Sequence, residues 1–388
     1  MGRAGAVGLG CQRAAFDLPG DVTYLNCATL SPSLRAVTAA GHAAVDAKAR
    51  PWGIGPPDFF AGPEEARALF AQVLGADADG VAIVPAVSYS MATAAANLSL
   101  GAGRRVLVLA EEFPSPYYAW KVAADRAGAE IATVPRPADG DWTAAVLGHI
   151  DERVAVVSVP NCHWTDGGLV DLVRVGAAAR AVGAALVVDA SQSLGAAPLD
   201  VEAVRPDVVV AVGYKWLLGP YSLGYAWFAP RWRDGVPREE NWMARAGSED
   251  FTGLVDYTDA YQSGARRYDM GEVANFLHLP MSIAALRQIR DWGVPRIAAT
   301  IRELVDAIAT DAEALGLAPT PAAHRLGHMV GLRFPAGAPP DLAKRLAEAQ
   351  VHVSVRGDAV RVAPHVYNDA RDVARLRDAL AVSLQFTS

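Results

Sequence analysis

The chain of 388 residues has 35 Lys and Arg against 42 Asp and Glu, a formal net charge of −7, and 52% hydrophobic residues. Such a composition is typical of a globular protein with roughly two or three domains, and it excludes a disordered chain. The acidic balance, without clustered Lys and Arg, also argues against a nucleic-acid partner and against an anionic membrane surface.

The three cysteines, Cys11, Cys27 and Cys162, are sparse and show no CxxC spacing. This pattern argues against a disulfide framework and against a structural metal site. No apolar run reaches the length of about 18 residues that a membrane span needs, and the N-terminus has no run typical of a secretory signal. We therefore expect a cytoplasmic protein, with residues 1–16 as a loose tail.

From about residue 80 to residue 230, short β-branched runs alternate with Ala-rich stretches of helical composition. The predicted strands are 81–85, 105–110, 154–159, 185–190, 207–212 and 223–228. Most of them are apolar on both faces, which is typical of parallel strands buried between two layers of helices. The alternation predicts an α/β fold, a three-layer, doubly wound and mostly parallel sheet, in a large domain over 17–280. Ligands of such sheets bind at the carboxyl ends of the strands.

Residues 231–275 lack clear periodicity and are rich in Trp, Arg, Asp, Tyr and Gly, which predicts a long ordered loop region of functional importance. After about residue 280 the pattern changes to that of a small C-terminal α+β domain over 281–388. The elements expected there are a long helical segment over 279–293 and 295–316, a strand over 328–334, a helix over 340–350, strands within 351–364 and a final helix over 369–385.

Two charged residues end predicted strands of the large domain. Asp189 follows an apolar strand, where a helix N-cap or a turn carboxylate would also explain it. Lys215 follows the next strand, and alone it could be a lysine that extends its amine to solvent. Their separation, 215 − 189 = 26 residues, suits a strand–helix–strand unit, so both charges should emerge at one edge of the sheet. Pyridoxal 5'-phosphate (PLP) chemistry needs such a pair: a desolvated amine that forms a Schiff base, and an acid that keeps the pyridine nitrogen protonated.

The segments DASQSLGAAPLD (189–200) and GYKWLLGPYSLGYAWF (213–228) resemble the cofactor signature of the class V aminotransferase family, which has PLP fold type I. That family includes cysteine desulfurases, kynureninases and isopenicillin N epimerase-like proteins. The resemblance extends from YLNCATLSPS (24–33) to VRVAPHVYND (360–369). It implies a PLP-dependent enzyme in which Lys215 carries the Schiff base and Asp189 pairs with the pyridinium.

The resemblance assigns further cofactor contacts. Gln192 would hydrogen-bond the ring 3-oxygen, and Tyr214 would bind the phosphate, although an aromatic residue at the sheet edge has an ordinary explanation too. Phe113 matches the position that stacks on the pyridine ring; as a lone Phe it would be a core residue. Ser88 and Tyr89 open a predicted helix after a strand, where N–H groups and hydroxyls can bind an anion; an ordinary Ser N-cap is the alternative.

The loop PNCHWTDGG (160–168) follows another predicted strand, at the same edge of the sheet. We expect Trp164 in the wall of the site and, from the family pattern, Thr165 near the ring oxygen. His163 could be a catalytic base, a substrate contact or a structural histidine. Asn275 matches a residue that reaches across a dimer interface to the partner's phosphate, which implies a homodimer with sites at the interface.

Substrate contacts also follow from the resemblance. Arg361 would bind the substrate carboxylate with its planar guanidinium, a bidentate geometry that Lys cannot offer, although a surface arginine on a strand is the alternative. Asn26 and Thr29 would line the substrate pocket from the N-terminal segment.

The family's shared chemistry is formation of an external aldimine followed by removal of the Cα proton by Lys215. Because no cysteine follows Cys162, a persulfide-forming desulfurase is disfavoured. We expect an epimerase- or lyase-type enzyme acting on an amino acid, with His163 or Tyr89 as a possible second acid or base. The alternatives are an aminotransferase or an oxidative PLP enzyme of specialised metabolism, and a non-catalytic binding protein is the least favoured. The absence of GxGxxG after the first strand disfavours a nicotinamide enzyme.

Overall fold

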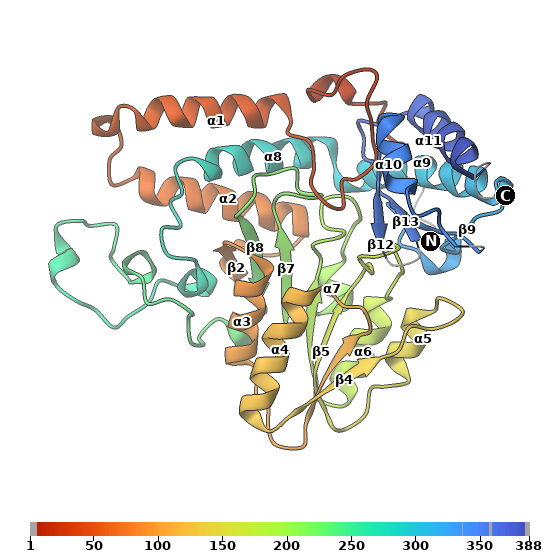
Figure 1. Ribbon diagram of the computed structural model, residues 1–388. Coiled ribbons are helices and arrows are strands. Elements are labelled where there is room, and N and C mark those ends of the chain that lie inside the picture. The colour runs from red at the N-terminus through yellow and green to blue at the C-terminus, as the bar shows by residue number, and fades with distance from the viewer. Residues whose placement is uncertain (1–5, 336, 357–358, 385–388) are drawn as a thin grey trace.

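The computed structural model describes residues 6–335, 337–356 and 359–384, and a seven-stranded sheet forms its centre (Figure 1). The strands lie in the order β2 (Val81–Val84), β8 (Gly224–Phe228), β7 (Val208–Val212), β6 (Ala185–Asp189), β5 (Val154–Pro160), β3 (Arg105–Leu109) and β4 (Glu130–Val134). β8 runs antiparallel to β2 and β7, and the other pairings in this sheet are parallel, so the predicted mostly parallel sheet is confirmed. The six predicted strands are present, and each end lies within one residue of its predicted position.

The fourth strand, β4, was not predicted. It forms the edge of the sheet, where Glu130 and Thr133 are exposed and only Val134 is fully buried. An edge strand that is half in solvent lacks the apolar character on both faces by which the other strands are recognised.

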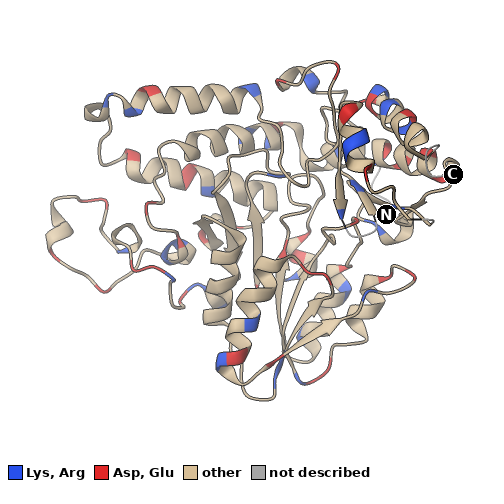
Figure 2. Ribbon diagram, viewed as in Figure 1, with Lys and Arg blue, Asp and Glu red and all other residues tan. Residues whose placement is uncertain are grey.

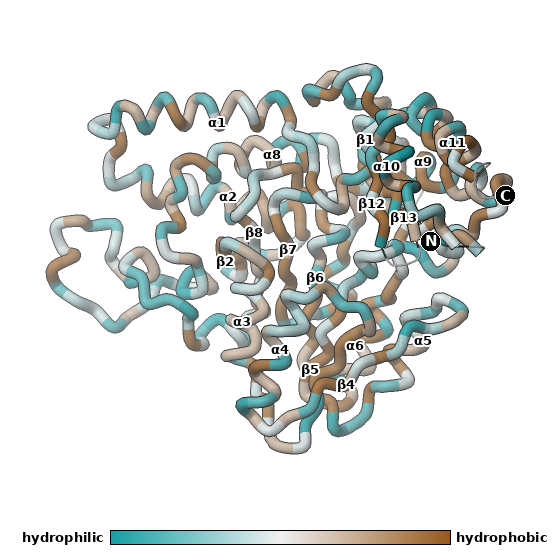
Figure 3. Tube along the Cα trace, viewed as in Figure 1, coloured by the Kyte–Doolittle hydropathy of each residue, from teal (hydrophilic) through white to brown (hydrophobic). Residues whose placement is uncertain are grey.

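Helices cover both faces of the sheet, because alternate residues along each strand point in opposite directions. Val106 and Val108 of β3 pack in one apolar cluster with α3 (Val87–Asn97) and α4 (Pro114–Ala127), whereas Leu107 and Leu109 pack in the other. That second cluster includes residues of α2 (Asp58–Leu74), α5 (Trp142–Leu147), α6 (Leu172–Ala181), α7 (Val201–Val204) and α8 (His278–Trp292). The hydropathy colouring shows the result, a brown centre with teal at the periphery (Figure 3). The three-layer fold is therefore confirmed.

The C-terminal part forms a smaller α+β unit, as predicted. Its antiparallel sheet has the order β12 (Ser354–Arg356), β13 (Ala359–Val362), β10 (Val330–Arg333) and β9 (Ala318–Pro319). A second sheet pairs β1 (Thr23–Tyr24) with β11 (Val351–His352) in parallel, which joins the N-terminal segment to this unit. The helices are α9 (Val294–Ala314), α10 (Leu342–Glu348) and α11 (Ala370–Leu384). The predicted helical segment after residue 279 is broken at Gly293, whose φ of 80° separates α8 from α9.

The N-terminal segment differs from the predicted loose tail. Residues 1–5 lie outside the described residues, but 6–16 pack on the C-terminal unit. Leu9 N donates to Thr300 Oγ1 at 2.6 Å, and Gln12 N donates to Val366 O at 2.7 Å. Phe16 is 1% exposed and meets the ring of Tyr367 edge-on, with centroids 4.9 Å apart. Burial of this aromatic ring holds the segment, which the low periodicity of the sequence did not reveal.

The remaining elements lie outside the sheets. Helix α1 (Arg35–Lys48) packs on α8, which in turn packs on α2, and the three helices are drawn together at the top of Figure 1. Short 3-10 turns are η1 (Arg13–Ala15), η2 (Pro51–Gly53), η3 (Ala78–Gly80), η4 (Pro230–Trp232), η5 (Trp242–Ala244), η6 (Gly253–Val255), η7 (Gly264–Tyr268) and η8 (Ala322–His324). Three of these, η5, η6 and η7, lie in the predicted loop region 231–275 and η4 overlaps its start; part of the region projects from the body (Figure 1).

Charged residues of both signs are interspersed over the helices and loops, and the central strands carry almost none (Figure 2). Across the described ranges, no helix combines the length and the apolar character that crossing a bilayer requires.

Candidate active site

A cavity of about 330 Å³ lies at the carboxyl ends of β5, β6 and β7, where a doubly wound sheet is expected to bind its ligand. Its volume falls within the range typical of small-molecule sites, about 300–1,000 Å³. The residues that line it come from the segments that follow β2, β3, β5, β6 and β7: Pro85, Ala86, Val87, Ser88, Glu112, Phe113, Ser115, Pro160, Cys162, Trp164, Asp189, Ser191, Gln192, Val212, Tyr214, Lys215, Tyr221 and Ser222.

Lys215 lies two residues beyond Gly213, which follows the buried strand β7, and its side chain points into this cavity. Its Nζ is 5.4 Å from the centroid of the Phe113 ring and 5.7 Å from that of Tyr214. Burial lowers the pKa of Lys215 from 10.5 to about 8, because the charged amine loses its water; Asp189 opposes this shift and Arg361 adds to it. The amine of Lys215 is therefore desolvated, as predicted, and the structure adds two aromatic rings near it.

Asp189 ends β6 in the same cavity. Ser191 N donates to its Oδ1 at 2.9 Å. Burial raises the pKa of the Asp189 carboxyl, while the Ser191 hydrogen bonds and the charge of Lys215 lower it. A buried carboxylate of this kind favours a cationic partner.

Gln192 lies beside this carboxylate with its side-chain amide fixed at both ends. Nε2 donates to Ala28 O at 3.1 Å, and Oε1 accepts from Trp216 Nε1 at 3.0 Å. One Nε2 hydrogen remains for a ligand.

The N-terminus of α3 forms one end of the cavity. No side chain caps this helix, so its first N–H groups are open to an anion. Ser88 lines the cavity from this first turn, and Phe113 lines it from the N-cap position of α4. Tyr89 points elsewhere: its hydroxyl donates to Asp269 O at 3.3 Å, and it does not line the cavity. Of the two phosphate ligands predicted on this helix, Ser88 lines the cavity and Tyr89 does not; Tyr214, also predicted to bind the phosphate, lines the cavity as well.

A second cavity of about 350 Å³ continues from the first. Both share Phe113, Trp164, Gln192, Tyr214, Lys215 and Tyr221, and the second adds Ala28, Thr29, Leu30, Arg356 and Arg361. The cavities thus meet at the Lys215 amine, with the carboxylate and the helix N-terminus on one side and two arginines on the other.

Arg361 is 1% exposed and is held from two directions. Its Nη1 donates to Trp164 O and its Nη2 to Thr29 Oγ1, both at 2.7 Å. Its buried Nε has no hydrogen-bond partner within the described residues. Burial and, next, the charge of Arg356 lower the pKa of Arg361 to about 9. A guanidinium that is buried, oriented and unneutralised is prepared to bind an anion.

Thr29 and Trp164 line the second cavity, as predicted, but Asn26 does not. Asn26 Oδ1 accepts from Ser354 Oγ at 2.8 Å, and Ser354 in turn lies 3.1 Å from Thr29 Oγ1. Asn26 therefore supports the wall rather than forming it.

His163 and Thr165 lie behind the wall, which agrees with the structural alternative for His163 and disagrees with the predicted position of Thr165 near the ring oxygen. The His163 ring is fully buried and stacks on Trp142 with centroids 4.9 Å apart. Its Nδ1 pairs with Thr165 Oγ1 at 2.8 Å and its Nε2 with Ala110 O at 3.1 Å, and burial lowers the pKa of the imidazole. Thr165 Oγ1 also accepts from Arg136 Nη2 at 2.9 Å. Because neither residue lines the two cavities, their geometry supports a structural role.

Asn275 likewise lies outside both cavities of its own chain. Its Oδ1 accepts from His278 N at 2.9 Å and from Leu277 N at 3.2 Å, so its side chain is bound to the backbone just before and at the first residue of α8. Its predicted contact with a partner's phosphate stays a prediction.

The sequence analysis missed several residues of the site. Glu112 lines the first cavity, where burial and the nearby charge of Asp189 raise the pKa of its carboxyl to about 8. Ser191, Tyr221 and Ser222 line the same cavity, and Arg356 lines the second. Arg356 had a usable signal, since it lies five positions before Arg361 in a strand-turn-strand pattern. Glu112 had one too, because it directly precedes Phe113.

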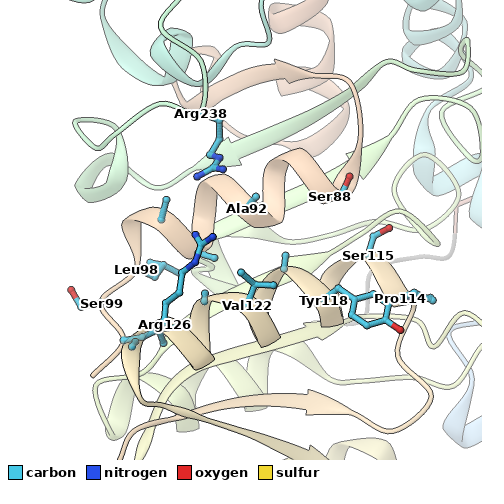
Figure 4. A pocket seen from close by; sticks show the side chains of 16 residues that line it. Ser88, Ala92, Leu98, Ser99, Pro114, Ser115, Tyr118, Val122, Arg126 and Arg238 are labelled. Atoms are coloured by element: carbon cyan, nitrogen blue, oxygen red, sulfur yellow. The ribbon is translucent and has the colours of Figure 1, made fainter. Parts of the chain in front are cut away.

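A larger open hollow of about 830 Å³ lies on the outer side of Ser88, between α3 and α4. Small residues such as Ala92 form its floor, and Arg126 and Arg238 approach it from different segments (Figure 4). It contains neither Lys215 nor Asp189, and both of these residues line the smaller first cavity.

The family model and the similar relatives found by comparison with known proteins agree on one family. Residues 58–384 match the Aminotransferase class-V family. Similar relatives include an uncharacterised aminotransferase of Bacillus subtilis, 28% identical over 323 residues that cover 82% of this chain and 83% of the relative. A kynureninase of Deinococcus radiodurans is 31% identical over 276 residues, 67% of this chain and 64% of the relative. An isopenicillin N epimerase of Streptomyces clavuligerus is 26% identical over 335 residues, which cover 81% of this chain and 83% of the relative.

Solved structures agree on the fold. A cysteine desulfurase of Thermococcus onnurineus, at 19% identity, superposes with a TM-score of 0.82 over 98% of this chain and 100% of its own. A lysine-to-alanine variant of C-DES, which holds glycine covalently linked to PLP, is 17% identical with a TM-score of 0.86 over 95% of this chain and 99% of its own. The predicted PLP fold type I is thereby confirmed.

Proposed function

This chain belongs to the class V aminotransferase family of PLP-dependent enzymes, and from that premise we propose that it acts at the Cα of an amino-acid substrate as an epimerase- or lyase-type enzyme. One observation carries the proposal: the buried amine of Lys215 and the buried guanidinium of Arg361 line the same cavity of about 350 Å³. The guanidinium can bind an α-carboxylate while the amine faces the adjoining Cα.

The residues present fit the cofactor, PLP. Lys215 would hold it covalently, and the Asp189 carboxylate would pair with the pyridine nitrogen. Ser88 and the open N–H groups of α3 would bind the phosphate, while Phe113 would lie against the ring. Gln192 has one amide hydrogen left for the ring 3-oxygen, and Tyr214 is available to the phosphate. When bound, the cofactor draws electron density away from the substrate Cα.

In this proposal Lys215 is the catalytic base. A pKa of about 8 leaves part of the amine neutral near neutral pH, which a lysine with an ordinary pKa would not allow. Arg361 orients the carboxylate so that the Cα–H bond faces Nζ. A proton donor is then needed for epimerisation or for a leaving group. His163 and Tyr89 do not line the cavities, so Tyr214 and Glu112, which do, are better suited to this role.

Incubation in D₂O with a panel of L-amino acids tests the proposal and separates its alternatives. Deuterated substrate with both configurations at Cα supports an epimerase, and a side-chain fragment supports a lyase. A keto acid with a stoichiometric amino acceptor supports the aminotransferase alternative, and oxygen consumption supports an oxidative enzyme. Deuterium exchange in none of the substrates, by protein that carries the cofactor, contradicts enzymatic action at Cα. Lys215→Ala is the control, since it should abolish exchange but leave the cofactor pocket intact.

We also propose that the enzyme is a homodimer with sites near the interface. The hollow between α3 and α4 supports this, because it is open, walled by small residues and adjacent to the phosphate end at Ser88. Tyr257, 98% exposed, projects from the loop region and is suited to burial by another copy. Light scattering should give twice the 40.8 kDa of one chain, and Asn275→Ala should then weaken retention of the cofactor. A monodisperse monomer contradicts this proposal.

A cytoplasmic location is the compartment we propose. Cys11, Cys27 and Cys162 are free thiols, and a reducing compartment keeps them so. Fluorescent fusion and cell fractionation test this directly.

A further inference from the structure

The second cavity has an unbalanced charge. It is lined by Lys215, Arg356 and Arg361, and no Asp or Glu is found among the described residues of its lining. In the proposed function Lys215 is committed to the cofactor and Arg361 to the α-carboxylate. That leaves the guanidinium of Arg356 in the substrate cavity with no carboxylate from the described part of the chain in the same lining.

The register of the small sheet fixes where Arg356 lies relative to Arg361. In the antiparallel pair β12–β13, Ser354 is opposite Arg361 and Arg356 is opposite Ala359. Arg356 and Arg361 are therefore diagonal neighbours on one face of the sheet, about 7–8 Å apart at the backbone. Trp164 contacts both: Arg361 donates to its carbonyl, and the guanidinium of Arg356 lies 5.7 Å from the centroid of its ring.

The guanidinium of Arg356 is largely uncommitted. Its one hydrogen bond within the described residues is from Nη1 to Val355 O, at 2.8 Å. It is half-buried and also lines a neighbouring cavity, which contains Glu111 and Asp166. Both of those carboxylates are already paired with Arg136, at 2.7 Å and 2.6 Å. Neither is ion-paired with Arg356.

Two guanidinium groups that lie on one sheet face and line one cavity of about 350 Å³ match a ligand with two anionic ends. We propose that Arg356 binds a side-chain carboxylate of the substrate, so that the enzyme selects dicarboxylic amino acids over their neutral counterparts. This inference rests on the proposed function, because it takes the second cavity to be the substrate cavity. Arg356 is then a specificity residue, while Arg361 serves every substrate.

The test compares acids with their neutral isosteres on the holoenzyme. The ligands are 2-methylglutamate with 2-methylglutamine, and 2-methylaspartate with 2-methylasparagine, which lack the Cα proton and so bind without turnover. Calorimetry should give dissociation constants about ten- to hundredfold lower for at least one acid than for its amide, as expected for a hydrogen-bonded ion pair. In Arg356→Gln the acid and its amide should bind about equally well, so that the ratio of their dissociation constants is about 1. Arg356→Lys should keep part of the preference for the acid, because the positive charge remains.

Arg333→Gln is the matched control. Arg333 lies on the same small sheet and lines only the neighbouring cavity, so its loss should leave the acid preference unchanged. Arg361→Gln should weaken the acid and the amide alike. Equal binding of acids and amides to the wild type overturns the inference and leaves the proposed function standing. If no amino acid binds holoenzyme with an intact cofactor spectrum, the proposed function itself fails.

Discussion

Uptake of PLP by the apoprotein should depend on pH in a way that reports the surroundings of Lys215. Only the neutral amine attacks the aldehyde, and burial lowers the pKa of Lys215 from 10.5 to about 8. At neutral pH this shift raises the neutral fraction about 300-fold over that of an ordinary lysine. The rate should therefore rise with pH, pass its midpoint near 8 and then level off.

The assay follows growth of the visible absorbance band after mixing apoprotein with PLP, from about pH 6 to about pH 11. Nα-acetyl-lysine, measured in the same buffers, corrects for ionisation of PLP itself and should keep accelerating to about pH 10 or above. Arg361→Gln removes a cation that helps to lower the pKa of Lys215, so its midpoint should move upward. A wild-type rate that follows the acetyl-lysine curve without levelling off refutes the reasoning, because the amine would then be solvated.

Three further substitutions have defined outcomes. Lys215→Ala should reduce kcat by at least about 10²–10⁴-fold, the contribution of a positioned base, while PLP still binds without a covalent link; unchanged kcat contradicts the mechanism. Arg67 and Asp269 form a buried ion pair, with Nη2 and Oδ2 2.8 Å apart. Arg67→Met should lower the free energy of unfolding by about 3–5 kcal/mol in urea titrations, since it leaves the Asp269 carboxylate buried without this partner. A loss below about 1 kcal/mol, roughly the value of a surface pair, contradicts burial of the pair. His163→Gln should lower Tm, because the stack on Trp142 is lost, and should leave the pH profile of kcat/KM unchanged. If an ionisation disappears from that profile, His163 acts as a catalytic base after all.

The main strands could be predicted because burial on both faces leaves an unmistakable apolar run, as in β7 (Val208–Val212). The edge strand β4 lacks that run, and the packing of Phe16 depends on a C-terminal partner far along the chain, Tyr367. Contacts between distant segments are not contained in local periodicity.

The site residues also divide into those that the local sequence reveals and those that it does not. Asp189 and Lys215 were recognisable because each charge follows an apolar strand, where an unpaired charge is costly. The loop residues around Trp164 were harder, since the chain turns there, with Gly167 N donating to His163 O at 2.9 Å, and a turn has no simple alternation of side-chain directions. Trp164 faces the cavity, while His163 and Thr165 face the core behind it. Ser88 lines the cavity and Tyr89 does not, because the side chains of consecutive helical residues point about 100° apart around the helix axis.

The central claim is that Lys215 holds the cofactor, and borohydride reduction of the PLP-loaded protein followed by peptide mass spectrometry tests it most directly. The sequence offers three other lysines, Lys48, Lys121 and Lys344, as internal comparisons. The account predicts a single pyridoxyl adduct, on the peptide that contains Lys215, and none in Lys215→Ala. A stoichiometric adduct on another lysine, or none in protein saturated with PLP, would contradict it.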